Sequence, residues 1–288
     1  MILDAHQHVW DLTRARYDWL GPQHGLIFRT ITEDEALPRL RRCGVDGVVL
    51  VQAADNAEDT AHMLATAARF AEVVAVVAYL PLEDPAAVAE QLPALAADPL
   101  VVGIRTLIHD LPDPDFLLRP EVGESLAMLA EVGLSYDVVA VLPRHLEHVP
   151  VLAERYPGLR LVIDHLAAPP IGNPGVEPWW SLLTRAAEYP DVYAKVSGLY
   201  PADDLTRWST EAVRPFVEHA LDVFGPRRLM YGGDWPVSIL AGDYDRVWAG
   251  LTPIWADLSA NDRAEVLSGT AVRCYGIDPD RLAALPVP

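Results

Sequence analysis

Short apolar runs rich in valine, isoleucine and leucine recur along this chain, and longer segments with apolar residues at helical spacing lie between them. Runs of about four to eight residues with β-branched side chains are typical of buried strands, whereas spacings of about three and four residues indicate amphipathic helices. The pattern predicts eight strands, at residues 2–5, 47–52, 73–79, 101–106, 135–139, 160–164, 192–196 and 228–231. Because each strand is followed by a helical segment, we expect an α/β fold of the (β/α)8 TIM barrel type.

Helix boundary signals agree with this division. Thr32 and Glu35 have the spacing of a capping box, and Gly44 is placed to end the helix that they begin. Asp84 and Pro85 are a typical start for another helix. Two later helices are predicted at residues 143–155 and 205–224.

The main competing architecture is a doubly wound open sheet. That fold predicts a glycine-rich turn after its first strand, but here the first strand leads into His6, Gln7 and His8. No change in composition or Ser/Gly linker divides the chain, and residues 167–178 are expected to form a long loop. We therefore expect a single domain over residues 1–288.

Composition and charge narrow the class of function. The chain has 288 residues, of which 51% are apolar, so it can bury a large core. Its net charge of -19 is unfavourable for binding nucleic acid or an anionic membrane surface, and favours a small-molecule substrate. We find no basic segment followed by a long apolar run and no stretch near the roughly 18 apolar residues of a membrane span, so a cytoplasmic protein is expected. The oligomeric state is left open.

Polar side chains gather where the predicted strands end. In a barrel these ends meet at one face, where the active site lies. His6 and His8 are two residues apart in an extended segment, so their side chains point to the same side. An H-x-H pair is a weak signal alone, but histidine and aspartate at the ends of other strands strengthen it. The full set comprises His6, His8, Arg105, Asp137, Asp164, His165, Lys195, Ser197 and Asp234.

Several segments around these residues resemble one known family. They read DAHQHVWD, YDWL, VVGIR, FLLRPEV, LSYDVV, LRLVIDHLAAPPI, YAKVSGLY and RLMYGGDWPV, and they are spread over nearly the whole chain. In combination they resemble the amidohydrolase-related metal-dependent hydrolases. Within that family they are most similar to the lactonase group, which includes L-fuconolactonases, L-rhamnonolactonases and pyrone-dicarboxylate lactonases. The resemblance implies a (β/α)8 barrel of the metal-dependent-hydrolase type that hydrolyses a small cyclic ester.

Lactone hydrolysis needs a base for water and groups that polarise the carbonyl. Asp234 is the candidate base, as the family resemblance also implies, and His6, His8, His165 and Arg105 are the candidates for stabilising the oxyanion. Arg105 could instead clamp a substrate carboxylate with its planar guanidinium group. Residues that could shape the substrate pocket are Arg105, Tyr136, Asp137, Lys195, Ser197 and Trp235.

A divalent metal is the expected cofactor if one is used. His6, His8, His165 and Asp234 together would suit one Zn²⁺ or Mn²⁺ ion. In strongly metal-dependent relatives the fifth strand carries a histidine and the fourth a lysine, whereas this chain has Asp137 and Arg105 in those regions. The resemblance therefore argues against a two-metal site and leaves open whether one ion is bound, since some members of the group work without metal.

Alternative interpretations remain for the whole site and for single residues. Decarboxylases acting on an aromatic or muconate-type acid resemble this chain in the H-x-H pair and the strand-8 aspartate, but they rely on a tightly held metal and on a strand-5 histidine that this chain lacks. A barrel that only binds a ligand is a further alternative, which leaves the converging histidines and aspartate unexplained. Asp137 and Asp164 could simply orient neighbours, Lys195 could form a buried ion pair, and His109 could either touch substrate or lie in solvent. Five other histidines are expected at the surface, namely His24, His62, His145, His148 and His219.

Overall fold

Eight parallel strands form the centre of the protein, as the periodicity predicts. The computed structural model describes residues 1–201 and 203–286, and its strands pair in chain order from β1 to β8. The segment after β8 pairs with β1, because Gln7 forms a β-bridge with Trp235 and the His8 amide donates to the Trp235 carbonyl at 2.7 Å. These contacts connect the last strand to the first. The strands are β1 (Leu3–Gln7), β2 (Gly47–Val51), β3 (Val73–Ala78), β4 (Val101–Thr106), β5 (Ser135–Val138), β6 (Leu161–Ile163), β7 (Val192–Val196) and β8 (Leu229–Tyr231).

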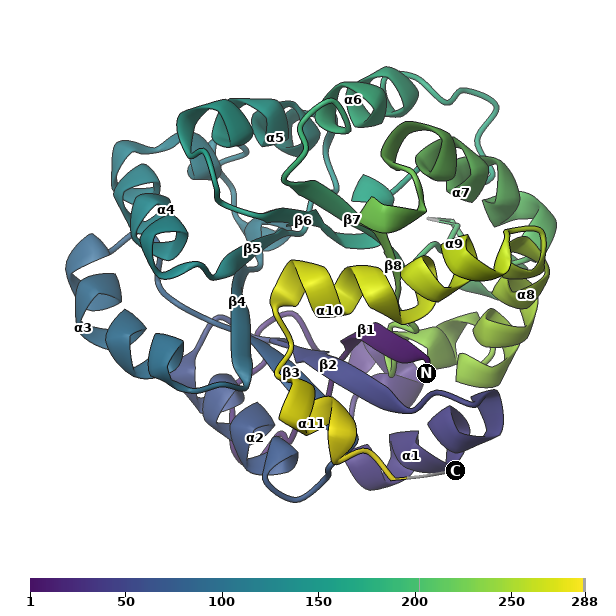
Figure 1. Cartoon of the computed structure of the whole chain (residues 1–288), viewed down its shortest axis with the longest axis horizontal. Helices are drawn as coiled ribbons and strands as arrows, with labels where there is room; N and C mark the ends of the chain where they lie inside the picture. The colour runs from purple at the N-terminus through teal and green to yellow at the C-terminus, as the bar shows by residue number, and fades with distance from the viewer. Residues whose placement is uncertain (202, 287–288) are drawn as a thin grey trace.

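Helices surround this barrel, and Figure 1 shows α1 to α8 as an outer ring. One of these helices follows each strand, which confirms the predicted (β/α)8 fold of a single domain. Among the described residues, three further α-helices come after α8, and a π-helical turn (Glu265–Gly269) joins the first of them to the second. The helices are α1 (Glu33–Cys43), α2 (Ala57–Ala67), α3 (Pro85–Ala97), α4 (Pro120–Val132), α5 (Pro143–Arg155), α6 (Trp179–Ala186), α7 (Thr210–Phe224), α8 (Tyr244–Ala256), α9 (Ala260–Ala264), α10 (Thr270–Tyr275) and α11 (Pro279–Ala283).

The helix boundary predictions had mixed outcomes. Gly44 ends α1 in the left-handed conformation with a φ of 70°, as predicted, and the Asp84 side chain caps α3 by accepting from the Ala87 amide at 3.1 Å. The capping box at Thr32 is wrong, because that side chain makes no capping bond and Glu35 pairs with an arginine instead. The helix predicted at residues 205–224 is interrupted, since α7 proper begins after a short 3-10 turn.

Strand alternation divides the apolar core into two layers. Val48 and Leu50 of β2 face the helices, whereas Val49 and Val51 belong to a second cluster inside the barrel. Tyr275 at the end of α10 belongs to this inner cluster, and Figure 1 shows α10 lying across the barrel on the side where the chain begins. The N-terminal face of the barrel is therefore covered, and the strand ends that carry the polar residues lie at the opposite face.

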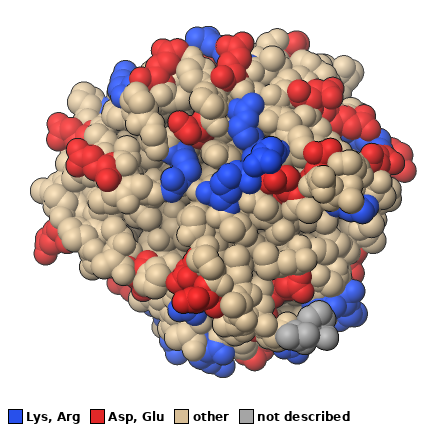
Figure 2. All heavy atoms as spheres, viewed as in Figure 1, with Lys and Arg blue, Asp and Glu red and all other residues tan. Residues whose placement is uncertain are grey.

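Charged side chains on the covered face do not form one continuous field. Figure 2 shows acidic side chains distributed around its rim and a small group of basic ones nearer the middle. Among the described residues, no helix combines the length and the apolar character that crossing a bilayer requires.

Candidate active site

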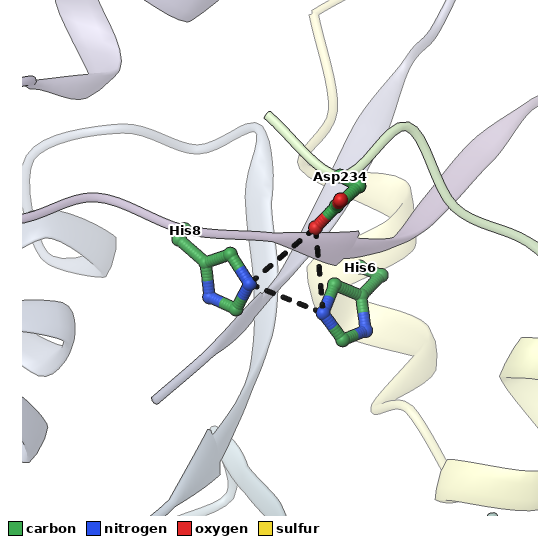
Figure 3. A group of neighbouring side chains, drawn as sticks. All are labelled: His6, His8 and Asp234. Carbon is green, nitrogen blue, oxygen red and sulfur yellow. Dashed lines mark hydrogen bonds and ion pairs between the residues drawn. The ribbon is translucent and has the colours of Figure 1, made fainter. Parts of the chain in front are cut away.

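The first strand places two imidazoles against each other. His6 lies in β1 and His8 directly follows it, both are buried, and their Nε2 atoms are 3.1 Å apart (Figure 3). The His8 Nδ1 atom is 2.7 Å from the Val51 carbonyl, to which it donates, so its Nε2 is the ring nitrogen that faces His6. The alternation of side chains along β1 therefore brings the two ring nitrogens to one point, as the sequence predicts.

Buried charges hold His6 from its other side. Its Nδ1 atom lies 3.3 Å from Asp164 Oδ1 and 3.1 Å from Lys195 Nζ. Burial, together with the charge of Lys195, lowers the pKa of His6 well below its ordinary value, so the ring is neutral. A neutral ring oriented by a carboxylate is the usual state of a histidine that binds metal.

Asp234 comes from the loop after β8 and completes this group. Its Oδ1 atom is 3.7 Å from His8 Nε2 and 3.9 Å from His6 Nε2 (Figure 3). The residue has a φ of 52°, which is strained for a non-glycine residue, and its amide donates to the His6 carbonyl at 2.8 Å. The strain is maintained because the chain here is hydrogen-bonded to β1, which fixes the carboxylate beside the imidazoles.

These three side chains fit a single divalent ion. Their donor atoms all lie within 4.8 Å of one another. Ligands about 2.0 Å from a tetrahedral Zn²⁺ are roughly 3.3 Å apart, which is close to the 3.1, 3.7 and 3.9 Å separations of the His6, His8 and Asp234 atoms. His165 is not part of this group, so its role as a fourth ligand stays a prediction.

An unusual turn after β6 places His165. Residues 165–168 all have positive φ values between 50° and 58°, although none is glycine. The His165 ring lies 4.4 Å from the ring of His6, measured between centroids, and its Nδ1 is 2.9 Å from Ser197 Oγ. Gly198 packs directly beneath, because a Cβ there would lie 2.3 Å from His165 Nδ1. The turn and the glycine together bring the imidazole to the cavity.

Arg105 reaches the same cavity but is already held on two sides. Its Nη1 donates to Asp164 Oδ2 at 2.9 Å, and its Nη2 donates to the Gln52 carbonyl. Nη1 also lies 3.4 Å from His6 Nε2. The guanidinium group is thus fixed in place, with its positive charge beside the imidazole pair.

Beneath the cavity lies a buried network of opposite charges. Lys195, the only lysine of the chain, donates to Asp137 Oδ2 at 2.6 Å and lies 3.1 Å from Asp164 Oδ1. Tyr275 donates to the same Asp137 oxygen at 2.8 Å. Although burial opposes ionisation of Asp164, the positive charge of Lys195, the hydrogen bond to His6 and the charge of Arg105 hold its pKa well below the ordinary value. Lys195, Asp137 and Asp164 therefore form a buried ion-pair network that orients His6.

A cavity of about 250 Å³ opens above these groups at the C-terminal ends of the strands. Of the predicted substrate-binding residues, Arg105 lines the cavity. Ser197 does not line it but contacts His165. The other four are fully buried and do not line the cavity, namely Tyr136, Asp137, Lys195 and Trp235. The lining residues are His8, Trp19, Ala53, Arg105, Leu107, His109, Val139, Val141, His165, Gly198, Tyr200, Asp234 and Val237.

Sequence reasoning did not single out the apolar wall of this cavity or Tyr200. Leu107, Val139 and Tyr200 lie within a few residues of the ends of β4, β5 and β7, so their position after a strand is the signal that could have indicated them. Trp19 and Val237 stand in the YDWL and RLMYGGDWPV segments that carry the family resemblance, but neither was singled out as a cavity residue; they reach the cavity from the connections after β1 and β8.

The other histidines differ from expectation in part. His109 lines the cavity and is also exposed to solvent, so both of its interpretations stay open. The expectation of surface positions is wrong for His145, His148 and His219, which are buried. His148 Nε2 lies 3.0 Å from Asp115 Oδ1, and His219 stacks on Trp180, so helix packing explains their burial.

Comparison with known proteins agrees with this geometry. The family model described as Amidohydrolase matches residues 3–277. The chain is 37% identical to L-fucono-1,5-lactonase of Burkholderia ambifaria and 32% identical to L-fucono-1,5-lactonase of Burkholderia multivorans, with 96% of each chain covered in both cases. A crystal structure of an amidohydrolase from Burkholderia multivorans with bound zinc has a TM-score of 0.86 and 31% identity, covering 96% of this chain and 100% of the other. A family match over nearly the whole length, together with relatives above 30% identity, shows that the chain belongs to the amidohydrolase family.

Proposed function

We propose that the protein is a hydrolase that opens a small cyclic ester, of the sugar-acid lactone class, with water activated by Asp234. The observation that carries this proposal is the position of Asp234 Oδ1, 3.7 and 3.9 Å from two imidazole nitrogens in a cavity at the C-terminal face of the barrel. The relatives named L-fucono-1,5-lactonase, 37% and 32% identical, support a sugar-acid lactone as the substrate.

In this mechanism Asp234 takes a proton from water as the water attacks the lactone carbonyl. A carboxylate can act as the base only if it is ionised and within hydrogen-bond reach of the water. The separation of nearly 4 Å between Asp234 and the imidazole nitrogens leaves its oxygens unbonded to those rings. The carboxylate is therefore free to accept a bond from a water molecule.

Positive charge for the developing oxyanion comes from Arg105, with His165 as a second donor. Both side chains line the cavity and are held in advance, Arg105 by Asp164 and His165 by Ser197. Donors fixed before reaction need little reorganisation, which makes them effective at stabilising a transition state. Because Nη1 and Nη2 of Arg105 are already paired, polarising a carbonyl suits it better than a bidentate clamp on a substrate carboxylate.

One divalent ion, Zn²⁺ or Mn²⁺, would be held by His6, His8 and Asp234, with His165 as a further candidate. When bound it would supply a Lewis acid and lower the pKa of a coordinated water. The Arg105 guanidinium lies 3.4 Å from His6 Nε2, so it places a permanent positive charge beside the proposed ion site. Arg105 would therefore stabilise the oxyanion together with the ion, and the ion would not be the sole source of that stabilisation.

The remaining predicted residues act indirectly in this proposal. Tyr136, Asp137, Lys195 and Trp235 support the site from below, since none of them lines the cavity. The net charge of -19 supports a small-molecule substrate rather than nucleic acid as the partner of this single-domain, cytoplasmic enzyme.

Asp234→Asn tests the proposal directly. We expect proton release from L-fucono-1,5-lactone to fall by about 10² to 10⁴-fold in kcat, because an amide cannot accept the proton of water. Asp191→Asn is the matched control, since Asp191 is exposed and precedes β7 at the opposite end of the barrel. Full turnover in the Asp234 variant would reject Asp234 as the base. Release of carbon dioxide from an aromatic acid, with no lactone hydrolysis, would instead establish the decarboxylase alternative.

A further inference from the structure

Apolar side chains form most of the wall of the cavity above the catalytic groups. Leu107 and Val139 each follow directly on the ends of β4 and β5, which are paired with Thr106 opposite Val138. Val237 lines the cavity from the connection after β8. The apolar lining residues are Trp19, Ala53, Leu107, Val139, Val141 and Val237.

The two large aromatic residues of the lining add ring surface to this wall. Trp19 donates its indole Nε1 proton to the Ala53 carbonyl at 2.7 Å, so that donor is already used. Tyr200 lines the cavity, but its hydroxyl group is buried beside Asp234. Neither residue therefore offers a free polar atom to a substrate that touches the wall.

Most polar groups of the lining are committed to the reacting end of the cavity. Arg105 donates from both terminal nitrogens to protein oxygens, and the Nδ1 atoms of His8 and His165 also contact protein oxygens. Together with Asp234, these groups face the position of the lactone carbonyl in the proposed reaction. Among the lining side chains, this leaves only His109 as a further polar group, and it is exposed to solvent.

This distribution determines which parts of a substrate the wall can recognise. A hydroxyl group that leaves water for an apolar wall loses hydrogen bonds unless the wall replaces them. A site that does bind substrate hydroxyls has buried polar groups, which an analogue without hydroxyls would leave unpaired, and such a site rejects that analogue strongly. Apart from the reacting end, this cavity has no such buried group among its lining side chains. Substrate hydroxyls would therefore point to the solvent at the mouth, and the ring carbons would contact the wall.

We propose that the protein also hydrolyses δ-lactones that carry an alkyl substituent and no ring hydroxyl groups. Water adds to the carbonyl carbon as Asp234 takes its proton, the bond from that carbon to the ring oxygen breaks, and the proton passes to the ring oxygen. The product is an aliphatic hydroxy acid. This inference rests on the proposed opening of lactones by Asp234, and it adds a second class of substrate that the apolar wall would bind.

The test compares L-fucono-1,5-lactone with δ-hexalactone in the wild-type protein. The two compounds share the six-membered ring and its methyl substituent, but δ-hexalactone has no ring hydroxyl groups. Proton release, corrected for spontaneous hydrolysis, gives kcat/KM for each enantiomer of δ-hexalactone. We expect the faster enantiomer to come within about 100-fold of L-fucono-1,5-lactone, because a site built to bind the hydroxyls would lose about 10⁴-fold or more. A loss of more than about 100-fold would overturn the inference.

Val139→Thr tests the wall itself. Threonine has nearly the shape of valine but adds a hydroxyl group to the wall. We expect kcat/KM for δ-hexalactone to fall about tenfold relative to that for L-fucono-1,5-lactone, because the lost apolar contact affects only a carbon without a hydroxyl neighbour. Val132→Thr is the control, since Val132 is 46% exposed at the end of α4, which leads into β5 at the opposite end of the barrel. It should leave the ratio unchanged, and an unchanged ratio in the Val139 variant would overturn the inference.

The outcomes separate this inference from the proposed function. If the wild-type protein hydrolyses neither lactone, both fail. If it hydrolyses L-fucono-1,5-lactone alone, the proposed function is supported and the inference is overturned. If it hydrolyses δ-hexalactone alone, the inference is supported and the sugar-acid class of the proposed function is rejected. Because the first comparison uses only wild-type protein, it decides the question even if the Val139 variant fails to fold.

Discussion

Glu33 is a buried carboxyl group whose ionisation should cost the protein stability at neutral pH. It is the first residue of α1 and is only 1% exposed. Gln7 Nε2 donates to its Oε2 atom, while Gln7 Oε1 and Glu33 Oε1 both have no partner among the described residues. Burial, which outweighs that hydrogen bond, raises the pKa of Glu33 to about 8 from an ordinary value of 4.5.

The sign and size of the effect follow from this shift. Below pH 4.5 the carboxyl is protonated in both the folded and unfolded states, so it costs nothing. As pH rises from there to about 8, only the unfolded state ionises, and the free energy of unfolding falls by about 1.4 kcal/mol per pH unit. Between pH 5 and pH 8 the free energy of unfolding falls by about 4 kcal/mol. The N-terminus of α1 favours negative charge, which reduces this fall by up to about 1 kcal/mol.

Glu33→Gln removes this titration and keeps a group that can pair with Gln7. The difference in unfolding free energy between variant and wild type should therefore grow by about 3 kcal/mol from pH 5 to pH 8, with the variant the more stable at pH 8. Urea unfolding followed by tryptophan fluorescence at the two pH values measures it. Glu35→Gln is the control on the same helix, because Glu35 is 38% exposed and pairs with Arg29, which lowers its pKa. An unchanged pH slope in the Glu33 variant, or a variant less stable at pH 8, would refute the reasoning.

Three shorter predictions concern the site and its supporting turn. Gly198→Ala should lower kcat/KM about 100-fold, because the new Cβ would lie 2.3 Å from His165 Nδ1, and a normal rate would show that the ring position is not critical. Ala168→Gly should raise the urea-derived stability by about 1 kcal/mol, because Ala168 is exposed with a φ of 50°, and no gain would contradict strain there. His8→Ala should weaken Zn²⁺ binding about 100-fold or more in competition with a chromophoric chelator, whereas unchanged affinity would place the ion elsewhere.

Local interactions explain why much of the fold is predictable from the sequence. Three predicted elements have the same bounds in the structure, namely the strands at 101–106 and 192–196 and the helix at 143–155. The signals that predict them are local, because they consist of apolar periodicity, Pro143 and Gly158. The capping box at Thr32 was predicted and is absent, because Arg29 offers Glu35 an ion pair that competes with the cap. Local motifs are thus reliable only where no tertiary partner competes for the same side chain.

By itself the sequence determined the barrel, and it determined that His6 and His8 share one side of the first strand, because alternation along a strand is a property of the backbone. Only the tertiary structure decided which polar residues face the substrate. It buried Lys195 and Asp137 against each other, since a charge inside the barrel requires a partner, and it turned Tyr200 into the cavity. These arrangements depend on contacts between segments far apart in the chain, up to the 240 residues that separate Asp4 and Tyr244, and no local pattern encodes them.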